Sequence, residues 1–363
     1  MRVLIAPCSF KESLTAKSAA EELARVVRAH GHTPDLAPIA DGGEGTLEIL
    51  KAPLGLRLRT ARVPGALGSL VRARFGVGDE LVVLEAAEAI GLAQVPRHQR
   101  RPLDASSLGL GRLLVRALEL QPRRILVGLG GSATVDGGAG LLAALGVRFL
   151  DARGRELMPT PRALTRLARV DKSGLDPRVA RTELTVLTDV RSPLLGPRGA
   201  ELYMAQKGVR PAELPSLRAL LRRLHPGASA RVPGAGAAGG LGAALHSVGA
   251  RLVPGIDVVL EAQRMRERIA ESDLVITGEG RLDRQTLEGK ALAALARLCR
   301  QEKKPLLALC GRVDLPPAVL RKAGVIALSV VPGPCTVEEA VRDAAANLAR
   351  SADAALTLLV ARR

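Results

Sequence analysis

The sequence predicts an α/β protein with two domains, one of which is built from both ends of the chain. Three observations carry this prediction. The chain has 363 residues, more than one ordinary core accommodates. Strand-helix-strand patterns occur at both ends, and glycine-rich turns follow several of the strands. We expect a flavodoxin-like or Rossmann-like doubly wound parallel sheet from residues 1–60 plus 236–363. Residues 61–235 would form an inserted α/β domain with a mixed sheet, with a cleft between the two domains.

The N-terminal segment predicts one βα unit followed by a second strand. Residues 2–6 are a mostly apolar run of strand length, and we expect a second strand at 33–39. Between them, apolar residues of segment 16–30 recur at the spacing of one helix face, and Gly31 supplies a C-terminal stop. Because βαβ units build parallel sheets, we expect these strands to be parallel neighbours.

The C-terminal segment repeats this pattern and would complete the same sheet. The expected elements are strands at 273–277, 305–310 and 325–330 and helices at 290–301 and 337–359. Five short parallel strands, divided between the two ends of the chain, would then form one doubly wound sheet.

The middle of the chain has a different pattern, which predicts the inserted domain. Short alternating segments between residues 60 and 83 indicate antiparallel or mixed strands. The further expected elements are a helix at 107–119, a strand at 124–127, a helix at 138–145, strands at 147–150 and 183–187, a helical hairpin leading to Pro233, and a helix at 241–248.

Composition narrows the class of protein. Hydrophobic residues make up 47% and charged residues 25%, as in globular proteins, and no stretch is long and apolar enough to span a bilayer. The N-terminus has no signal-peptide pattern, so we expect a cytoplasmic protein with its four cysteines reduced.

The formal net charge of +17 raises the question of nucleic-acid binding. Forty-four of the 53 basic residues are arginines, and they occur singly or in pairs without forming a basic tract. The chain has no Trp, one Tyr and three Phe, which leaves few platforms for base stacking. We therefore expect no nucleic-acid partner, although a positive field would concentrate anionic small molecules.

The strongest phosphate-binding candidate is the loop at 128–138. It follows a strand, opens a helix and contains five glycines, so its backbone N–H groups could hold an anion. It matches neither the Walker A loop nor the Rossmann fingerprint. A tight turn without a ligand is the alternative. The candidate residues are Gly130, Gly131, Ser132 and Thr134.

A second glycine-rich loop at 233–240 also precedes an expected helix. Its small residues would allow the backbone to approach a ligand closely, or would allow the following helix to pack tightly on a sheet. The candidate residues are Gly234, Gly236, Gly239 and Gly240.

Carboxylates beside strand ends suggest phosphoryl transfer. Kinases use one carboxylate to orient or deprotonate the attacking hydroxyl and others to hold Mg²⁺ against the phosphates. We assign the first role to Asp189 and expect Asp41, Asp189 and Asp283 to bind metal. The wider acidic set is Asp41 with its neighbours Gly42 and Gly43, Glu44, Asp136, Asp189, Glu279 and Asp283.

The chain has only nine lysines, so each well-placed one is informative. Lys11 lies in the first loop, Lys207 in a Gln-Lys-Gly turn, and Lys290 after the Asp283 loop. Each could place a positive charge near the transferred phosphoryl group or a substrate carboxylate, with Lys11 and Lys290 assigned to catalysis. A solvated lysine is the alternative for Lys207 and Lys290.

These motifs resemble, in order and over essentially the whole chain, the bacterial glycerate kinases of the galactarate/glyoxylate-pathway type. The matching blocks are 5–16 (IAPCSFKESLTA), 40–46 (ADGGEGT), 130–140 (GGSATVDGGAG), 189–196 (DVRSPLLG), 206–208 (QKG), 233–240 (PGAGAAGG), 277–285 (TGEGRLDRQ) and 289–290 (GK). The resemblance implies ATP-dependent phosphorylation of D-glycerate with Mg²⁺, giving 2-phosphoglycerate, with Ser9 and Lys207 among the substrate- or phosphate-binding residues.

Two positions depart from the pattern of that family. Cys8 stands where the family commonly has an aspartate, and segment 107–111 (SLGLG) lacks a threonine hydroxyl. Other functions therefore stay open: a glycerate 3-kinase, a kinase of another small hydroxy acid, or a non-catalytic nucleotide- or metabolite-binding protein. We expect no membrane partner, and a homodimer is the assembly we consider.

Overall fold

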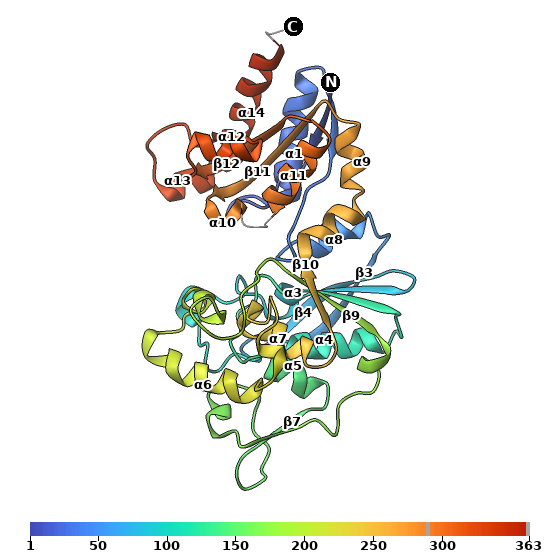
Figure 1. The fold of residues 1–363 in the computed structure, drawn as a ribbon, viewed down its shortest axis with the longest axis vertical. Coiled ribbons are helices and arrows are strands. Elements are labelled where there is room, and N and C mark those ends of the chain that lie inside the picture. The colour runs from blue at the N-terminus through green and yellow to red at the C-terminus, as the bar shows by residue number, and fades with distance from the viewer. Residues whose placement is uncertain (288–290, 361–363) are drawn as a thin grey trace. The chain divides into compact units, whose positions relative to one another are not determined.

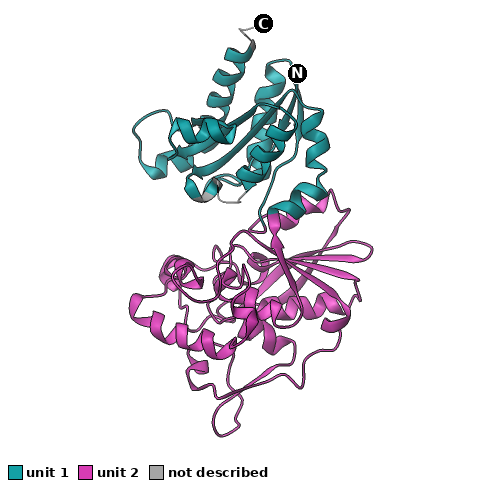
Figure 2. Cartoon of the chain, viewed as in Figure 1, with its two compact units in different colours: residues 1–41, 256–363 teal, residues 42–255 magenta. Residues whose placement is uncertain are grey.

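The computed structural model describes residues 1–287 and 291–360, and the chain divides into two compact units (Figure 2). Unit 1 combines Met1–Asp41 with Ile256–Arg363, and unit 2 comprises Gly42–Gly255. As predicted, one unit is built from both ends of the chain. The expected cleft between the domains stays a prediction.

The sheet of unit 1 is entirely parallel, as predicted. Among the described residues it has the order β13-β12-β11-β1-β2. Figure 1 labels β11 and β12 of this sheet. Its strands are β1 (Arg2–Ile5), β2 (Thr33–Leu36), β11 (Leu274–Leu282), β12 (Leu306–Val313) and β13 (Ile326–Ser329). Numbered along the chain this is the order 2-1-3-4-5, in which the direction of winding reverses between β1 and β11.

Helices of unit 1 pack on this sheet through apolar faces. α1 (Ala16–Ala29) begins at Thr15, whose side chain accepts a hydrogen bond from Ser18 N. It packs with α14 (Ala344–Val360) over the buried side chains of β1, β11 and β12. The other helices are α8 (Gly255–Ala262), α9 (Met265–Ala270), α10 (Arg284–Leu287), α11 (Ala291–Gln301), α12 (Pro317–Ala323) and α13 (Val337–Arg342). The single helix expected at 337–359 is divided at Asp343, whose dihedral angles leave the helical region (φ −96°, ψ 13°).

The sheet of unit 2 is mixed, as predicted for the inserted domain. Its order is β10-β9-β6-β5-β4-β3, with β3, β4 and β5 antiparallel neighbours and β5, β6, β9 and β10 parallel. The strands are β3 (Arg57–Pro64), β4 (Leu70–Val77), β5 (Leu81–Glu85), β6 (Arg124–Gly128), β9 (Glu183–Thr188) and β10 (Arg251–Pro254). A separate antiparallel pair joins β7 (Arg148–Leu150) to β8 (Arg169–Asp171).

Four helices cover one face of this mixed sheet. They are α3 (Ala86–Ile90), α4 (Leu108–Leu118), α5 (Ala139–Ala144) and α7 (Leu241–His246), whose buried side chains form one core with β5, β6 and β9. α2 (Thr46–Lys51) packs near β4 and β5, where the side chain of Leu47 comes close to Gly76.

Unit 2 is longer at both ends than the inserted domain predicted at 61–235, because residues 42–60 and 236–255 belong to it. Residues 42–60 belong to this unit because Leu47 N donates to the Glu85 carboxylate at the end of β5. Residues 236–255 belong to it because Gly239 packs against the backbone of Thr134 and β10 pairs with β9.

The prediction of a helical hairpin before Pro233 is wrong. Residues 189–232 are all described, and within them the structure has one α-helix, α6 (Leu214–Leu224), together with short 3₁₀ turns. Five prolines and several glycines interrupt this segment, so a second long helix cannot continue through it. No helix in the described part of the chain has the length and apolarity that a membrane span requires.

Candidate active site

Two of the predicted loops meet at the carboxyl edge of the unit 2 sheet. Gly130, two residues after β6, donates its N–H to Gly42 O (3.0 Å), and Leu129 N donates to Leu187 O near the end of β9 (3.2 Å). A Cβ on Gly130 would lie 2.3 Å from Gly43 Cα. The close approach of two backbones therefore explains this glycine, and the turn at 42–45 and the loop at 128–138 form one structure.

Glu85, which the sequence analysis did not single out, holds the turn at 42–45 in place. It is 3% exposed, and its two carboxylate oxygens accept from Gly45 N and Leu47 N, each at 2.9 Å. Burial raises the pKa of Glu85 to about 7, the two amide bonds oppose this, and the nearby carboxylates of Glu88 and Glu44 add to it. An acidic residue ending an apolar strand run was the signal in the sequence.

Asp136 is a structural anchor of the glycine loop. It is fully buried, and its carboxylate accepts from Ser107 N (2.7 Å), Ser107 Oγ (2.8 Å), Gly138 N (3.1 Å) and Gly140 N (3.0 Å). Burial raises the pKa of Asp136 although these four bonds oppose the shift. Leu110, which stands where the threonine hydroxyl is missing, lies in the core of unit 2.

Ser132, Thr134 and Lys207 are buried together beneath this loop. Lys207 Nζ donates to Ser132 Oγ (3.1 Å) and to Thr134 O (2.9 Å), so Lys207 is not the solvated lysine of the alternative interpretation. Burial lowers the pKa of Lys207 to about 8, and the negative charge of Asp136 opposes that shift.

His225, to which the sequence analysis gave no role, supports the same loop. Its Nε2 lies 2.7 Å from Gly137 O and donates to it, and burial lowers the pKa of this imidazole. No sequence signal pointed to this contact, because the two residues are 88 positions apart.

The loop at 233–240 packs against the first glycine loop. Gly234, Gly236, Gly239 and Gly240 are buried. Gly137 N donates to Gly239 O (3.1 Å), and a Cβ on Gly239 would lie 2.3 Å from Thr134 O. Gly236 N donates to Ser192 O (2.9 Å). In the structure these glycines therefore pack against neighbouring loops, and phosphate binding by the 233–240 loop stays a prediction.

Solvent reaches a smaller set of predicted residues at this edge. Gly131 is exposed, Gly130 and Gly43 are half-buried, and Asp189, directly after β9, is exposed. A ligand from solution can contact these groups, and it can also contact Glu44, which is exposed in the turn at 42–45.

Unit 1 brings a second set of predicted residues to the point where its sheet reverses. Cys8 N donates to Gly278 O (2.8 Å), which fixes the loop after β1 along β11. Phe10 packs on Gly278, while Ser9 and Lys11 on either side of it are exposed. Ligands of doubly wound sheets bind at such reversal points, outside the carboxyl ends of the strands.

Three further predicted residues belong to this unit or lie outside the described residues. Glu279 is half-buried on β11, in register with Cys310 of β12. Asp283 Oδ1 accepts from Thr286 N (3.2 Å) and so caps α10. Lys290 lies outside the described residues.

The predicted metal ligands are divided between the two units. Asp41 and Asp283 belong to unit 1 and Asp189 to unit 2. Within residues 1–287 and 291–360, no three His, Cys, Asp or Glu side chains come together as a metal-binding group.

The fold and its loops define an α/β protein with ligand-accessible groups at the strand ends of two sheets. The model of the glycerate kinase family matches residues 3–360. A glycerate kinase of Bacillus subtilis is 41% identical over 97% of this chain and 96% of its own length. The glycerate 2-kinase of Escherichia coli is 39% identical over 100% and 99%. A crystal structure assigned as a glycerate kinase 2 from Salmonella typhimurium LT2 superimposes with a TM-score of 0.81, at 37% identity over 99% and 98% of the two chains.

The chain therefore belongs to the glycerate kinase family, which confirms the resemblance found in its sequence motifs, and it is an enzyme of the kinase class.

Proposed function

We propose that this enzyme transfers the γ-phosphoryl group of ATP to the 2-hydroxyl of D-glycerate and releases 2-phosphoglycerate. The observation that carries the proposal is the family match over residues 3–360, which includes every loop described above. The relative named glycerate 2-kinase, aligned over the whole chain, supports the 2-position.

In unit 2, the accessible backbone N–H groups of Gly43 and Gly131 would hold the phosphates of ATP, while the Gly130 N–H is already bonded to Gly42 O. Backbone N–H groups bind phosphate without a side-chain charge, and glycine lets a ligand approach them closely. Asp189 would orient the attacking hydroxyl and accept its proton, because its carboxylate is exposed directly after β9.

Magnesium fits this donor set. Mg²⁺ in kinases is commonly held by one or two carboxylates together with substrate phosphates and water, so a preformed protein cage is not required. Asp189 would hold it, with Asp41 and Asp283 as further candidates. The bound ion would neutralise charge on the phosphates.

In unit 1, the exposed Ser9 and Lys11 would bind the carboxylate of glycerate, with Glu279 beside them on β11. Cys8 removes a carboxylate that is common at this position, so the remaining acidic groups would carry its role. We further propose a cytoplasmic location, where ATP is supplied.

The test is turnover by the purified full-length chain. ADP release that depends on D-glycerate, with NMR placing the new phosphate on carbon 2, would support the proposal. Phosphate on carbon 3 would make the enzyme a glycerate 3-kinase, and turnover of another hydroxy acid alone would change the substrate. Nucleotide binding without turnover of any such acid would favour the non-catalytic binding protein.

A further inference from the structure

We propose that Lys207 is a positioning residue that fixes the exposed turn Gly130–Gly131 from inside unit 2, without contacting the substrate itself. It acts through Ser132 and Thr134, the residues that follow this turn. The inference rests on the proposed function, which gives the turn its phosphate ligand.

The ammonium group of Lys207 is already committed to the protein. The residue is 4% exposed, and its Nζ bonds to Ser132 Oγ at 3.1 Å and to Thr134 O at 2.9 Å. A buried charge without hydrogen-bond partners is costly, so the folded protein strongly favours keeping both of these bonds.

A substrate has no room to reach Lys207 through the adjoining cavity. That cavity measures about 10 Å³ and is lined by Lys207 together with Ala133, Arg100, Arg101 and apolar neighbours. This volume suits at most one water molecule and excludes a phosphate group.

The main chain around Lys207 is itself held firmly. Arg100 Nη1 donates to Gln206 O (2.7 Å), and Lys207 N donates to Met204 O (3.0 Å). Gly208 ends this turn with φ +94°, a left-handed conformation that glycine adopts without strain. Lys207 therefore projects from a rigid support.

The segment that Lys207 contacts is supported from a second side as well. Ala133 N donates to Ile90 O (2.8 Å), and Leu92 N donates to Gly131 O (2.7 Å). Removing the Lys207 ammonium would leave Ser132 Oγ and Thr134 O without their buried donor. Residues 131–134 would then keep only the hydrogen bonds to the 90–92 segment and the packing of Gly239 against Thr134.

The other buried polar groups anchor a different part of the loop. Asp136 accepts from Gly138 N and Gly140 N, and His225 donates to Gly137 O. Loss of Lys207 is therefore expected to loosen the half of the loop that carries the exposed turn, while the half leading into α5 stays in place.

Hydrogen exchange on the full-length, ligand-free protein tests this directly. In Lys207→Met, we expect amide exchange of a peptide containing Ala133 to accelerate about tenfold or more, as loss of one charged hydrogen bond implies. Lys172→Met, which removes an exposed lysine of the same unit, should exchange as wild type does. Unchanged exchange in Lys207→Met would overturn the inference.

Ser132→Ala supplies an independent arm, because it removes one acceptor of Lys207 with little change in volume. If Lys207→Met does not fold, faster exchange at Ala133 in Ser132→Ala would support the inference and unchanged exchange would overturn it. In the folded variants, kcat/KM for ATP of the double variant should equal that of Lys207→Met within about threefold. Losses that multiply would show that Lys207 acts on the substrate separately.

The exchange experiment separates this inference from the proposed function. Accelerated exchange in a protein that does not turn over D-glycerate would retain the positioning role and reject D-glycerate as the substrate. Turnover of D-glycerate with unchanged exchange in Lys207→Met would support the proposed function and overturn the positioning role of Lys207.

Discussion

At the scale of single residues, Asp189 is the group on which the proposed chemistry depends most. It is exposed directly after β9, next to the junction of the two glycine-rich turns. Asp189→Asn keeps the shape of the side chain but cannot accept a proton, so we expect kcat to fall by about 10²–10⁴-fold. Steady-state ADP release measures this.

The matched control is Asp79→Asn, which neutralises an exposed aspartate elsewhere in unit 2 and should leave kcat unchanged. A rate for Asp189→Asn within about threefold of wild type would remove Asp189 from the role of general base.

Asp136 has a structural role, whereas Asp189 is proposed to act in catalysis. The sequence around the two aspartates does not distinguish these roles. Its four hydrogen-bond donors include Ser107 N and Oγ, 29 positions away, and no local pattern announces that contact. In Asp136→Asn, one side of the carboxyl group becomes an NH₂ that faces other donors. We expect the free energy of unfolding to fall by about 1–3 kcal/mol in urea titrations. An unfolding midpoint equal to that of wild type would contradict the anchoring role.

At the scale of elements, α2 depends on a carboxylate from the neighbouring strand β5. The folded-state pKa of Glu85, about 7, lies above its ordinary value of 4.5, so the folded state holds a proton more tightly between these values. The free energy of unfolding should therefore fall as the pH rises from about 5 to about 7, by roughly 3 kcal/mol at most.

Glu85→Gln removes this titration, and its free energy of unfolding should vary less over the same interval. Urea unfolding of both proteins between pH 5 and pH 8 measures the difference. Parallel pH profiles for the two proteins would show that Glu85 does not titrate in this range.

The junction of the loops after β6 and before α2 tolerates no side chain at Gly130. In Gly130→Ala, the new methyl group would lie 2.3 Å from Gly43 Cα, and backbone atoms cannot yield as a flexible side chain does. We expect a loss of about 1–3 kcal/mol in the free energy of unfolding, together with weaker ATP binding by calorimetry.

Gly227→Ala is the control for that variant, because nothing lies within 4 Å of the added Cβ in the same unit. If the two alanine variants were equally stable and bound ATP equally well, the turns at 42–45 and 128–138 would not form the joint structure described here.

Local pattern was enough to predict most of the elements. Apolar periodicity located α1 and α4, and β-branched runs located β1, β6 and β9, because these signals depend on neighbours a few positions away. The packing of residues 42–60 and 236–255 into unit 2 depends on long-range contacts, such as Gly45 N with Glu85, and was beyond such patterns. The same limit hid the contacts of Lys207 and His225 with the glycine loop.

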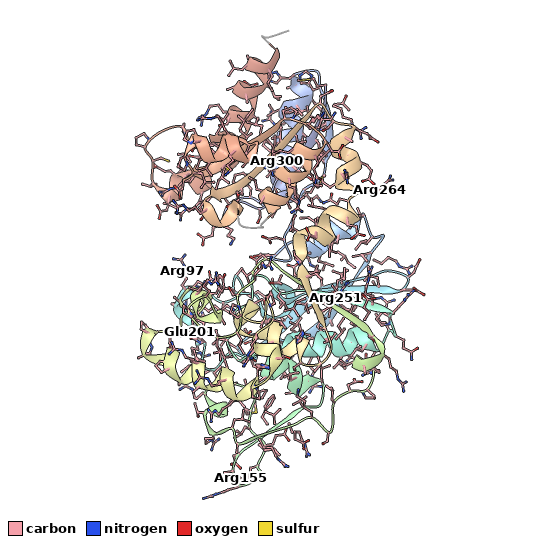
Figure 3. The ribbon with its side chains drawn as sticks, viewed as in Figure 1. Arg97, Arg155, Glu201, Arg251, Arg264 and Arg300 are labelled. Carbon is pink, nitrogen blue, oxygen red and sulfur yellow. The ribbon has the colours of Figure 1, made fainter. Side chains whose placement is uncertain are left out.

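At the scale of the whole molecule, the positive charge is dispersed over both units. Figure 3 shows Arg155 and Arg251 of unit 2 and Arg264 and Arg300 of unit 1 at separate places on the surface. Several arginines are paired with acids, as Arg155 is with Asp151 and Arg251 with Glu183. This distribution fits a general attraction of anionic substrates better than one nucleic-acid surface.

The central claim is that the strand-end turns of unit 2 bind the triphosphate of ATP. A crystal structure with magnesium and a non-hydrolysable ATP analogue tests it most directly. We predict phosphate oxygens within hydrogen-bonding distance of backbone amides in the turn at 42–45 and of the Gly131 amide. A nucleotide bound away from both turns would contradict the claim, even if the protein proved to be an active glycerate kinase.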